Sequence, residues 1–226
     1  MTMLFSADTL PKFRLALLGV CSLAMLSGCG GKNELVLDSG VGVNVVRSAC
    51  PAVGIPVYTG DITTFSPVDS RDANAIDMVA NITNVRSQCN DAAGDKIYTA
   101  TTFDVLARRT NTRGARQVTL PYFTTVMRGG TAVISKRLGA VTISFADGQE
   151  RAQASGTAGS YVDRAEASLP DDVRERLTRK RRAGDADAAI DPLSDPQVRA
   201  AVARASFEQL IGFQLTPDQL QYNATR

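Results

Sequence analysis

The feature that most constrains the fold is an alternation of apolar and polar residues that recurs through the middle of the chain. Such runs lie at residues 76–83, 97–106, 117–127 and 140–146, and a shorter one lies at 41–45. Successive side chains of a β-strand point to opposite faces, so each run predicts a half-buried strand. Turn residues separate the runs. Residues 41–160 are therefore expected to form one mainly β domain, an antiparallel sandwich.

Three local signals add detail to this β domain. Pro121 lies inside a predicted strand, and because proline cannot donate a ladder hydrogen bond, it predicts an edge strand or a bulge. Asp147-Gly148 predicts a hairpin turn that leads into a partner strand at residues 149–155. The glycine-rich segments at 129–130 and 156–159 predict turns.

The composition changes after residue 160, and residues 161–226 are expected to form a helical C-terminal region. Pro170 is followed by two aspartates, as at the start of a helix. Residues 184–193 are expected to form a linker, after which Ser194 or Asp195 caps a second helix. Its apolar stripe comprises Val198, Ala201, Val202, Ala205, Leu210 and Ile211, and Gly212 ends it. A last turn or short helix is expected to begin at Thr216.

The N-terminus carries the three parts of an export signal. Lys12 and Arg14 precede an apolar run at residues 15–26, and small residues follow. A cationic stretch, a short apolar core and a small-residue cleavage site are typical of a secretory signal. The apolar run is shorter than the roughly 20 residues that cross a bilayer. Residues 1–28 are therefore predicted to be a signal peptide.

The end of this signal, Leu26-Ser27-Gly28-Cys29, resembles the lipobox of bacterial lipoproteins. In that family the cysteine receives a diacylglycerol, a peptidase cuts before it, and the new amine is acylated. The resemblance implies that Cys29 carries the lipid and that residues 29–40 form a tether. Gly30 and Gly31 stand where enterobacterial members retained in the inner membrane have aspartate. The resemblance therefore implies the outer membrane, with the body on the periplasmic side.

The body is also loosely similar to the immunoglobulin-like domains of bacterial envelope proteins, in its short strands and turn spacing. The expected fold class is thus an antiparallel immunoglobulin-like sandwich followed by a C-terminal α-helical segment. This is a likeness of architecture only.

Two cysteines remain once Cys21 leaves with the signal and Cys29 carries lipid. Because the periplasm is oxidising, Cys50 and Cys89 are expected to form a disulfide. The bond would close a loop of about 40 residues and stabilise the fold by about 4 kcal/mol. A redox pair is the alternative, but the two residues lack C-x-x-C spacing.

The absence of histidine excludes several chemistries. Serine or cysteine nucleophiles activated by histidine, and histidine metal sites, are ruled out. Catalysis by a pair of carboxylates or by a Ser-Lys dyad stays open, yet no carboxylate pair stands out, and adjacent residues such as Ser135 and Lys136 point to opposite faces of a strand. The acids Asp61, Asp69, Asp72 and Asp77 match no calcium-loop spacing. The sequence predicts no catalytic residue, no metal and no cofactor. A net charge of +2 gives no indication of nucleic-acid binding.

Two segments are candidate contact surfaces. The first is a basic run, and its cations are Arg174, Arg176, Arg179, Lys180, Arg181 and Arg182. It could contact lipid headgroups or an acidic partner, or form a solvated helix face neutralised by nearby acids. The second is the stripe at Phe207, Leu210, Ile211 and Phe213, which could bind a partner as a helix or pack on its own domain.

The sequence favours a non-enzymatic structural or adaptor component of a cell-envelope assembly, held on the membrane by lipid and bound to another envelope protein. The alternative is a lipoprotein that holds a lipid or small molecule between the sheet and the helical tail.

Overall fold

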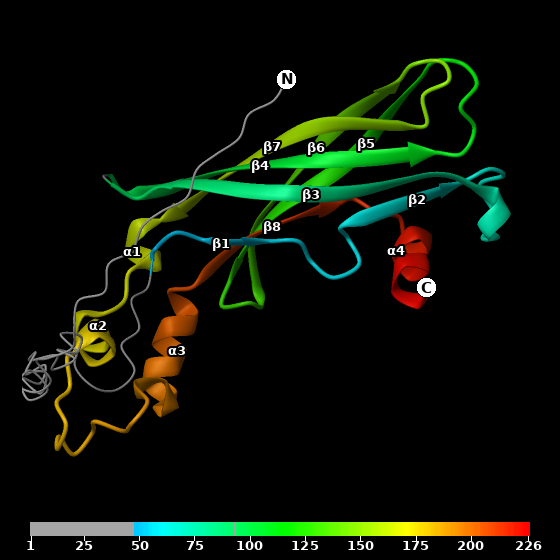
Figure 1. Ribbon diagram of the computed structural model, residues 1–226. Coiled ribbons are helices and arrows are strands. Elements are labelled where there is room, and N and C mark those ends of the chain that lie inside the picture. The colour runs from blue at the N-terminus through cyan, green and yellow to red at the C-terminus, as the bar shows by residue number, and fades with distance from the viewer. Residues whose placement is uncertain (1–47, 93) are drawn as a thin grey trace, which may run out of the picture. The chain divides into compact units, whose positions relative to one another are not determined.

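A computed structural model describes residues 48–92 and 94–226 (Figure 1). The predicted signal peptide, the predicted lipid attachment at Cys29, the predicted tether and the run at 41–45 lie outside the described residues. The described part is mainly β, as the alternation predicted. Its strands are β1 (Ala52–Gly54), β2 (Asp61–Phe65), β3 (Ile76–Asn90), β4 (Lys96–Arg109), β5 (Arg116–Arg128), β6 (Ala132–Phe145), β7 (Arg151–Asp163) and β8 (Phe207–Phe213).

These strands form two sheets. One has the order β1-β8-β5-β6 and the other β2-β3-β4-β7. All neighbours are antiparallel except β1 and β8, which are parallel. The chain changes sheet four times, after β1, β4, β6 and β7. These crossings make the fold depend on pairings between distant segments.

The main core lies between the two sheets and contains inward-facing residues of both. On β4 the pattern is regular: Phe103, Val105 and Ala107 are buried, whereas Thr102 and Leu106 are exposed. The cluster comprises Ile62, Met78, Ala80, Ile82, Phe103, Val105, Ala107, Leu120, Val141, Ile143, Phe145, Ile211 and Phe213. Burial of this apolar surface is the principal force that holds the sheets together.

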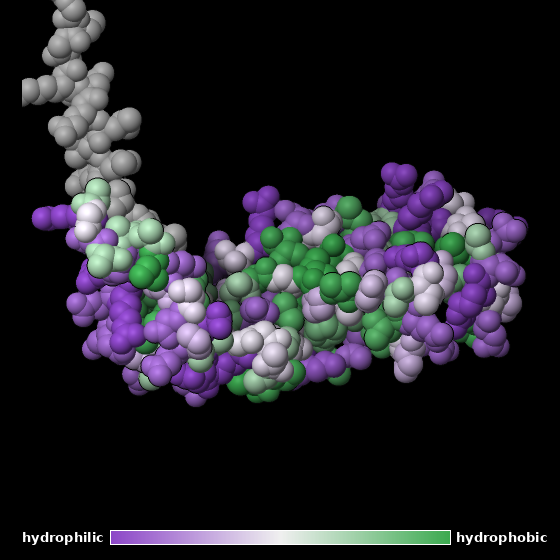
Figure 2. Space-filling model, turned by 90° about the horizontal axis from the view of Figure 1, so that it is seen from below, coloured by the Kyte–Doolittle hydropathy of each residue, from purple (hydrophilic) through white to green (hydrophobic). Residues whose placement is uncertain are grey.

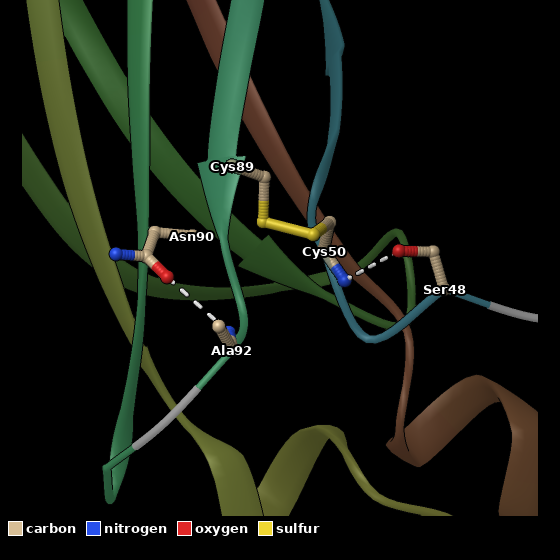
Figure 3. The surroundings of a disulfide bond; sticks show 5 residues. All are labelled: Ser48, Cys50, Cys89, Asn90 and Ala92. Atoms are coloured by element: carbon tan, nitrogen blue, oxygen red, sulfur yellow. Dashed lines mark hydrogen bonds between the residues drawn. A yellow bond between two sulfur atoms is a disulfide. The ribbon is translucent and has the colours of Figure 1, made fainter.

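Cys50 and Cys89 form a disulfide, as predicted (Figure 3). Their Cα atoms are 6.1 Å apart. Cys50 lies two residues before β1 and Cys89 lies near the end of β3, so the bond connects the margins of the two sheets. It packs against a second apolar cluster of Ile97, Val126, Val162, Ala167 and Phe207.

The strand that contains Pro121 is not an edge strand, so that alternative was wrong, but it does carry an irregularity, at a distance from Pro121. β5 lies between β6 and β8, and its irregularity occurs at Val126/Met127. The carbonyl oxygen of Pro121 accepts a hydrogen bond from the N–H of Gln214, one residue beyond the end of β8. The ring nitrogen points to the same side, where the ladder has already ended, so the missing donor costs little.

The glycine predictions were partly wrong. Gly129 and Gly130, with φ of 61° and 74°, form the turn between β5 and β6 as expected. Gly156 and Gly159, however, lie inside β7. A Cβ on Gly156 would stand 2.3 Å from Cζ of Phe103. Glycine is needed there because an aromatic ring crosses the strand, and not because the chain turns.

Asp147-Gly148 does form a turn, but not a hairpin. The N–H of Gln149 donates to the carbonyl oxygen of Ala146, and Gly148 has a φ of 76°. The strand that follows, β7, pairs with β4 of the opposite sheet instead of with β6. The turn therefore carries the chain across the sandwich.

Arg109 is a fully buried cation at the end of β4, with 1% of its surface exposed. Its guanidinium donates to four backbone carbonyls, and it lies over the ring of Phe145. The acceptors are the oxygens of Thr112, Gly114, Ala146 and Gln149, at 2.8 to 2.9 Å. One side chain thus joins the turn after β4 to the turn after β6.

The helices after β7 are α1 (Arg164–Ala167), α2 (Asp171–Thr178) and α3 (Pro196–Arg204), followed after β8 by α4 (Pro217–Thr225). Short 3-10 turns lie at Ala73–Ala75 and Pro192–Ser194. α2 begins just after Pro170, and the Asp195 side chain caps α3 by accepting from the N–H of Gln197. α2 and α3 share a third apolar cluster of Val173, Leu177, Val198 and Ala201.

The prediction that one helix continues through Ile211 was wrong. α3 ends at Arg204, and Phe207–Phe213 forms β8 between β1 and β5. Phe207, Gln209 and Ile211 are all buried, which is the period of a strand. Gly212 lies against Thr59, whose Oγ1 would stand 2.3 Å from an added Cβ. The proposed partner-binding helix at 207–213 is therefore a strand in the core of its own domain.

An ion pair joins the sheets at one end of the sandwich and predicts a pH dependence. The Arg116 guanidinium donates to both carboxylate oxygens of Asp77, at 2.7 and 2.6 Å. Hydrogen bonding from Arg116 lowers the pKa of the Asp77 carboxyl below its ordinary value of 3.8. Burial opposes this shift, whereas the charge of Arg116 and the hydrogen bond from Thr64 add to it. A carboxyl group whose pKa is lower in the folded state than in the unfolded state stabilises the fold fully at pH values above its unfolded-state pKa. This stabilisation is lost as the pH falls through the folded-state pKa.

We therefore expect Asp77→Asn to reduce stability at pH 7 and to flatten the decline in stability below about pH 4. Urea unfolding midpoints measured between pH 7 and pH 3 test this. Arg116→Gln and the double variant Asp77→Asn/Arg116→Gln serve as controls. The double variant should be at least as stable as the less stable of the two single variants, because it leaves no unpaired charge. An acid-side slope as steep in Asp77→Asn as in the parent would contradict the assignment.

Candidate functional site

The predicted basic face lies on α2 and the segment after it, and its cations are interleaved with acids. Arg174 pairs with Asp171, and Arg176 pairs with Asp195 at 3.4 Å. Arg179 and Arg181 both pair with Asp187. Arg181 is 4% exposed, and its guanidinium also donates to the carbonyl oxygen of Arg176. Lys180 is likewise in contact with other groups of the protein. The backbone N–H of Arg182 donates a hydrogen bond to the carboxylate of Asp185.

A surface hollow of about 460 Å³ lies beside this face. Its wall includes Asp172, Glu175, Asp191 and Asp195 together with Arg176 and Arg179. Both signs of charge therefore line the same hollow. These ion pairs fasten α2 to the segment that leads into α3, and the use of the face as a contact surface remains a prediction.

The four acids at 61–77 are not brought together. Asp61 pairs with Arg226, and Asp77 pairs with Arg116. Across residues 48–92 and 94–226, no group of three or more histidine, cysteine or carboxylate side chains could hold a metal ion.

A groove at the open margin between β6 and β7 has a chemistry that the sequence did not predict. It has a volume of about 370 Å³. We call it the tyrosine groove, and its lining residues are Tyr98, Tyr122, Thr124, Arg137, Leu138, Gly139, Thr157, Ala158, Gly159 and Tyr161. They come from four strands, β4 to β7, which belong to both sheets. The groove therefore exists only once the two sheets have assembled.

Two glycines position the tyrosines. A Cβ on Gly139 would stand 2.4 Å from Cζ of Tyr122, and a Cβ on Gly159 would stand 2.8 Å from the hydroxyl of Tyr98. Each ring thus lies across the backbone of a neighbouring strand, where only glycine leaves room. The hydroxyl of Tyr122 donates to the carbonyl oxygen of Thr157 at 2.7 Å, and burial raises the pKa of Tyr122. This bond links β5 to β7.

The outer part of the groove is open to solvent. The rings of Tyr98 and Tyr161 lie with centroids 4.7 Å apart, and Tyr161 remains 55% exposed. Leu138 on the opposite wall is 68% exposed. Among the residues that the structure describes, Arg137 is the one charged residue of the lining, and none of the described acids forms an ion pair with it. The groove is therefore aromatic and carries one positive charge.

The strand beside the groove has a free edge. Within the described residues β6 pairs only with β5, and residues 132–138 are exposed throughout. Val133 and Ile134 are large apolar residues in this stretch. An edge strand presents unpaired N–H and C=O groups that can pair with another chain. The free edge and the tyrosine groove thus form one continuous surface.

A second exposed surface is apolar. Figure 2 shows apolar side chains gathered in the middle of the face seen from below, on the side of β1 and β8. Ile55 and Val57, which follow β1, are exposed.

Comparisons with protein-family models, with curated proteins and with solved structures find no match to this chain. None of the helices in the described residues is both long enough and apolar enough to span a bilayer.

Proposed function

We propose that this chain is a non-enzymatic outer-membrane lipoprotein that faces the periplasm and acts as a structural or adaptor component of a cell-envelope assembly. The lipobox ending at Cys29, followed by Gly30 and Gly31, supports the anchor and its membrane. The Cys50–Cys89 disulfide supports an oxidising compartment, because structural disulfides are rare in the cytosol.

The tyrosine groove carries the binding part of this proposal. Tyrosine and arginine are enriched among the residues that contribute most to protein interfaces. Here three tyrosines and Arg137 share one open groove beside a free strand edge. The space between the sheets is packed with large side chains, among them Phe103, Phe145 and Phe213. The groove on the surface is therefore a better binding site than the interior, and this favours the adaptor over a carrier of buried lipid.

Two features support the immunoglobulin-like form of the sandwich. The chain crosses between the sheets after β1, β4, β6 and β7, and the disulfide joins segments that belong to the margins of different sheets.

The anchor is tested by the intact mass of the protein purified from native membranes. We expect a mass that fits residues 29–226 with three acyl chains, and an unlipidated precursor for Cys29→Ser. Density fractionation of the membranes should place the lipidated protein with the outer membrane. A mature protein without lipid would overturn the membrane part of the proposal.

The adaptor role is tested by photo-crosslinking in intact cells. A photo-crosslinking amino acid in place of Tyr161 should capture a specific envelope protein. The same amino acid in place of Tyr58 is the matched control, because Tyr58 is 51% exposed and lies outside the groove. Capture of no protein at position 161 above the level at position 58 would overturn the adaptor role.

A further inference from the structure

We propose that the tyrosine groove and the free edge of β6 bind an extended acidic segment of a partner protein, which adds to the sheet as a strand beside residues 132–138. The inference rests on the proposed function and specifies the partner chemistry. The backbone, the charge and the aromatic content of this surface each support it.

The backbone of β6 favours an extended polypeptide over a compact ligand. Residues 132–138 are exposed, and within the described part of the chain they pair on one side only, with β5. Their unpaired N–H and C=O groups match those of another strand, which is how β-strand addition gains affinity. The tyrosine groove begins where this stretch ends, because Arg137, Leu138 and Gly139 of β6 line it together with residues of β7. An added strand would therefore run along residues 132–138 and end at the tyrosines.

The charge of the surface favours an acidic segment. Lys136 and Arg137 lie next to each other on the free edge, and Arg137 lines the groove. Successive side chains of a strand point to opposite faces, so the two cations flank the edge on both sides. Cations on an edge discourage pairing with a like-charged edge, including that of a second copy of this chain. The same cations attract carboxylates, and no acid among residues 48–92 and 94–226 lines the groove.

The tyrosines give the segment a fixed end. Tyr98 and Tyr161 present an exposed ring pair, and Tyr122 is held by its bond to Thr157. Rings that are already in place lose little conformational freedom on binding, which favours affinity. An apolar or aromatic side chain of the partner would pack on the pair, and a neighbouring carboxylate would pair with Arg137.

The test uses the full lipidated protein in detergent micelles and two fluorescent octapeptide libraries. In one, Glu alternates with Val, Thr or Tyr, and in the other, Lys replaces every Glu. Fluorescence anisotropy should show binding of the acidic library, weakened by added salt, and not of the basic one. Arg137→Glu should lower the affinity at least about tenfold, because a charge-assisted hydrogen bond is lost and a repulsion is gained. Arg151→Glu, the same change at the far end of β7, should leave it unchanged.

Strand addition is separated from side-chain recognition by N-methylation of the peptide backbone. Methyl groups on one alternating set of residues should abolish binding, because that set donates to β6, whereas methylation of the other set should not. Equal binding of both methylated forms would overturn strand addition. Equal binding of the acidic and basic libraries would overturn the acidic specificity.

The two proposals fail in different ways. If position 161 captures an envelope protein in cells but the acidic library does not bind, strand addition by an acidic segment is overturned and the adaptor role stands. Capture of a second copy of this chain would make the edge a dimer interface and overturn the proposed partner. If the captured peptide is rich in Asp or Glu and extended, the inference is supported.

Discussion

Replacing Arg109 with methionine is expected to lower the free energy of unfolding by about 3 to 5 kcal/mol. Methionine matches the apolar stem of arginine but cannot donate a hydrogen bond. The carbonyls of Thr112, Gly114, Ala146 and Gln149 would lose their shared donor. Each hydrogen bond to a charged group is worth about 1.5 to 3 kcal/mol, and bonds to one group are not additive. Urea unfolding followed by far-ultraviolet circular dichroism measures the change.

The neighbouring residue supplies a matched control. Arg108 has 69% of its side chain exposed and pairs on the surface with Glu150. Exposed ion pairs contribute little, so Arg108→Met should change stability by less than about 1 kcal/mol. Arg109→Lys keeps the positive charge but loses the planar guanidinium group. Its loss of stability should therefore lie between those of Arg108→Met and Arg109→Met. A loss of stability as large at position 108 as at position 109 would show that the four carbonyl bonds do not carry the effect.

The strands could be predicted wherever neighbouring residues decide the structure. On β4 the alternation from Ile97 to Ala107 specifies both the strand and its buried face. The same parity assigns Arg109 to the core side, two residues beyond Ala107. A cation at a core position predicts a buried polar network. The partners that satisfy it come from turns about 5 and 40 residues away, and no local pattern could identify them.

β8 was misassigned because local and distant interactions favour different structures. Leu210 and Ile211 continue the apolar spacing of the preceding alanine-rich helix, which favours a helix locally. The pairing of Phe207–Phe213 with β5, more than 70 residues earlier in the chain, favours a strand. Tertiary context overrides propensity where it buries more apolar surface, and here it buries Phe207, Ile211 and Phe213.

The tyrosine groove could not be predicted because its residues are dispersed over β4 to β7. The one available signal lay in the glycines inside strands. Gly139 and Gly159 each lie beside a tyrosine of the adjacent strand. Glycine within a strand often marks a bulge, a bend or the close approach of another group. Such glycines near tyrosines indicate a ring that crosses the strand, but not which strands will meet.

Removal of the disulfide is the second change with a large expected effect. The variant Cys50→Ala/Cys89→Ala is expected to lose about 4 kcal/mol of stability, because the bond closes a loop with a sequence separation of 39 residues in the unfolded chain. Local packing adds to this, since both cysteines cover the cluster that contains Ile97, Val126 and Phe207. A loss of this size is a large fraction of the stability of an ordinary domain. Urea unfolding in the presence and absence of a reductant measures it.

Reduction of the parent protein should reproduce the effect of the double variant, and the double variant should not respond to the reductant. Because the cysteines connect the margin before β1 to the end of β3, the loosened state should first expose the amides of β1 and of residues 87–90 to hydrogen exchange. The main core between the sheets contains neither cysteine, so its amides should keep their relative protection. A reduced protein within about 1 kcal/mol of the oxidised one would mean that the unfolded chain is already compact near these residues, since the loop entropy model assumes an open chain.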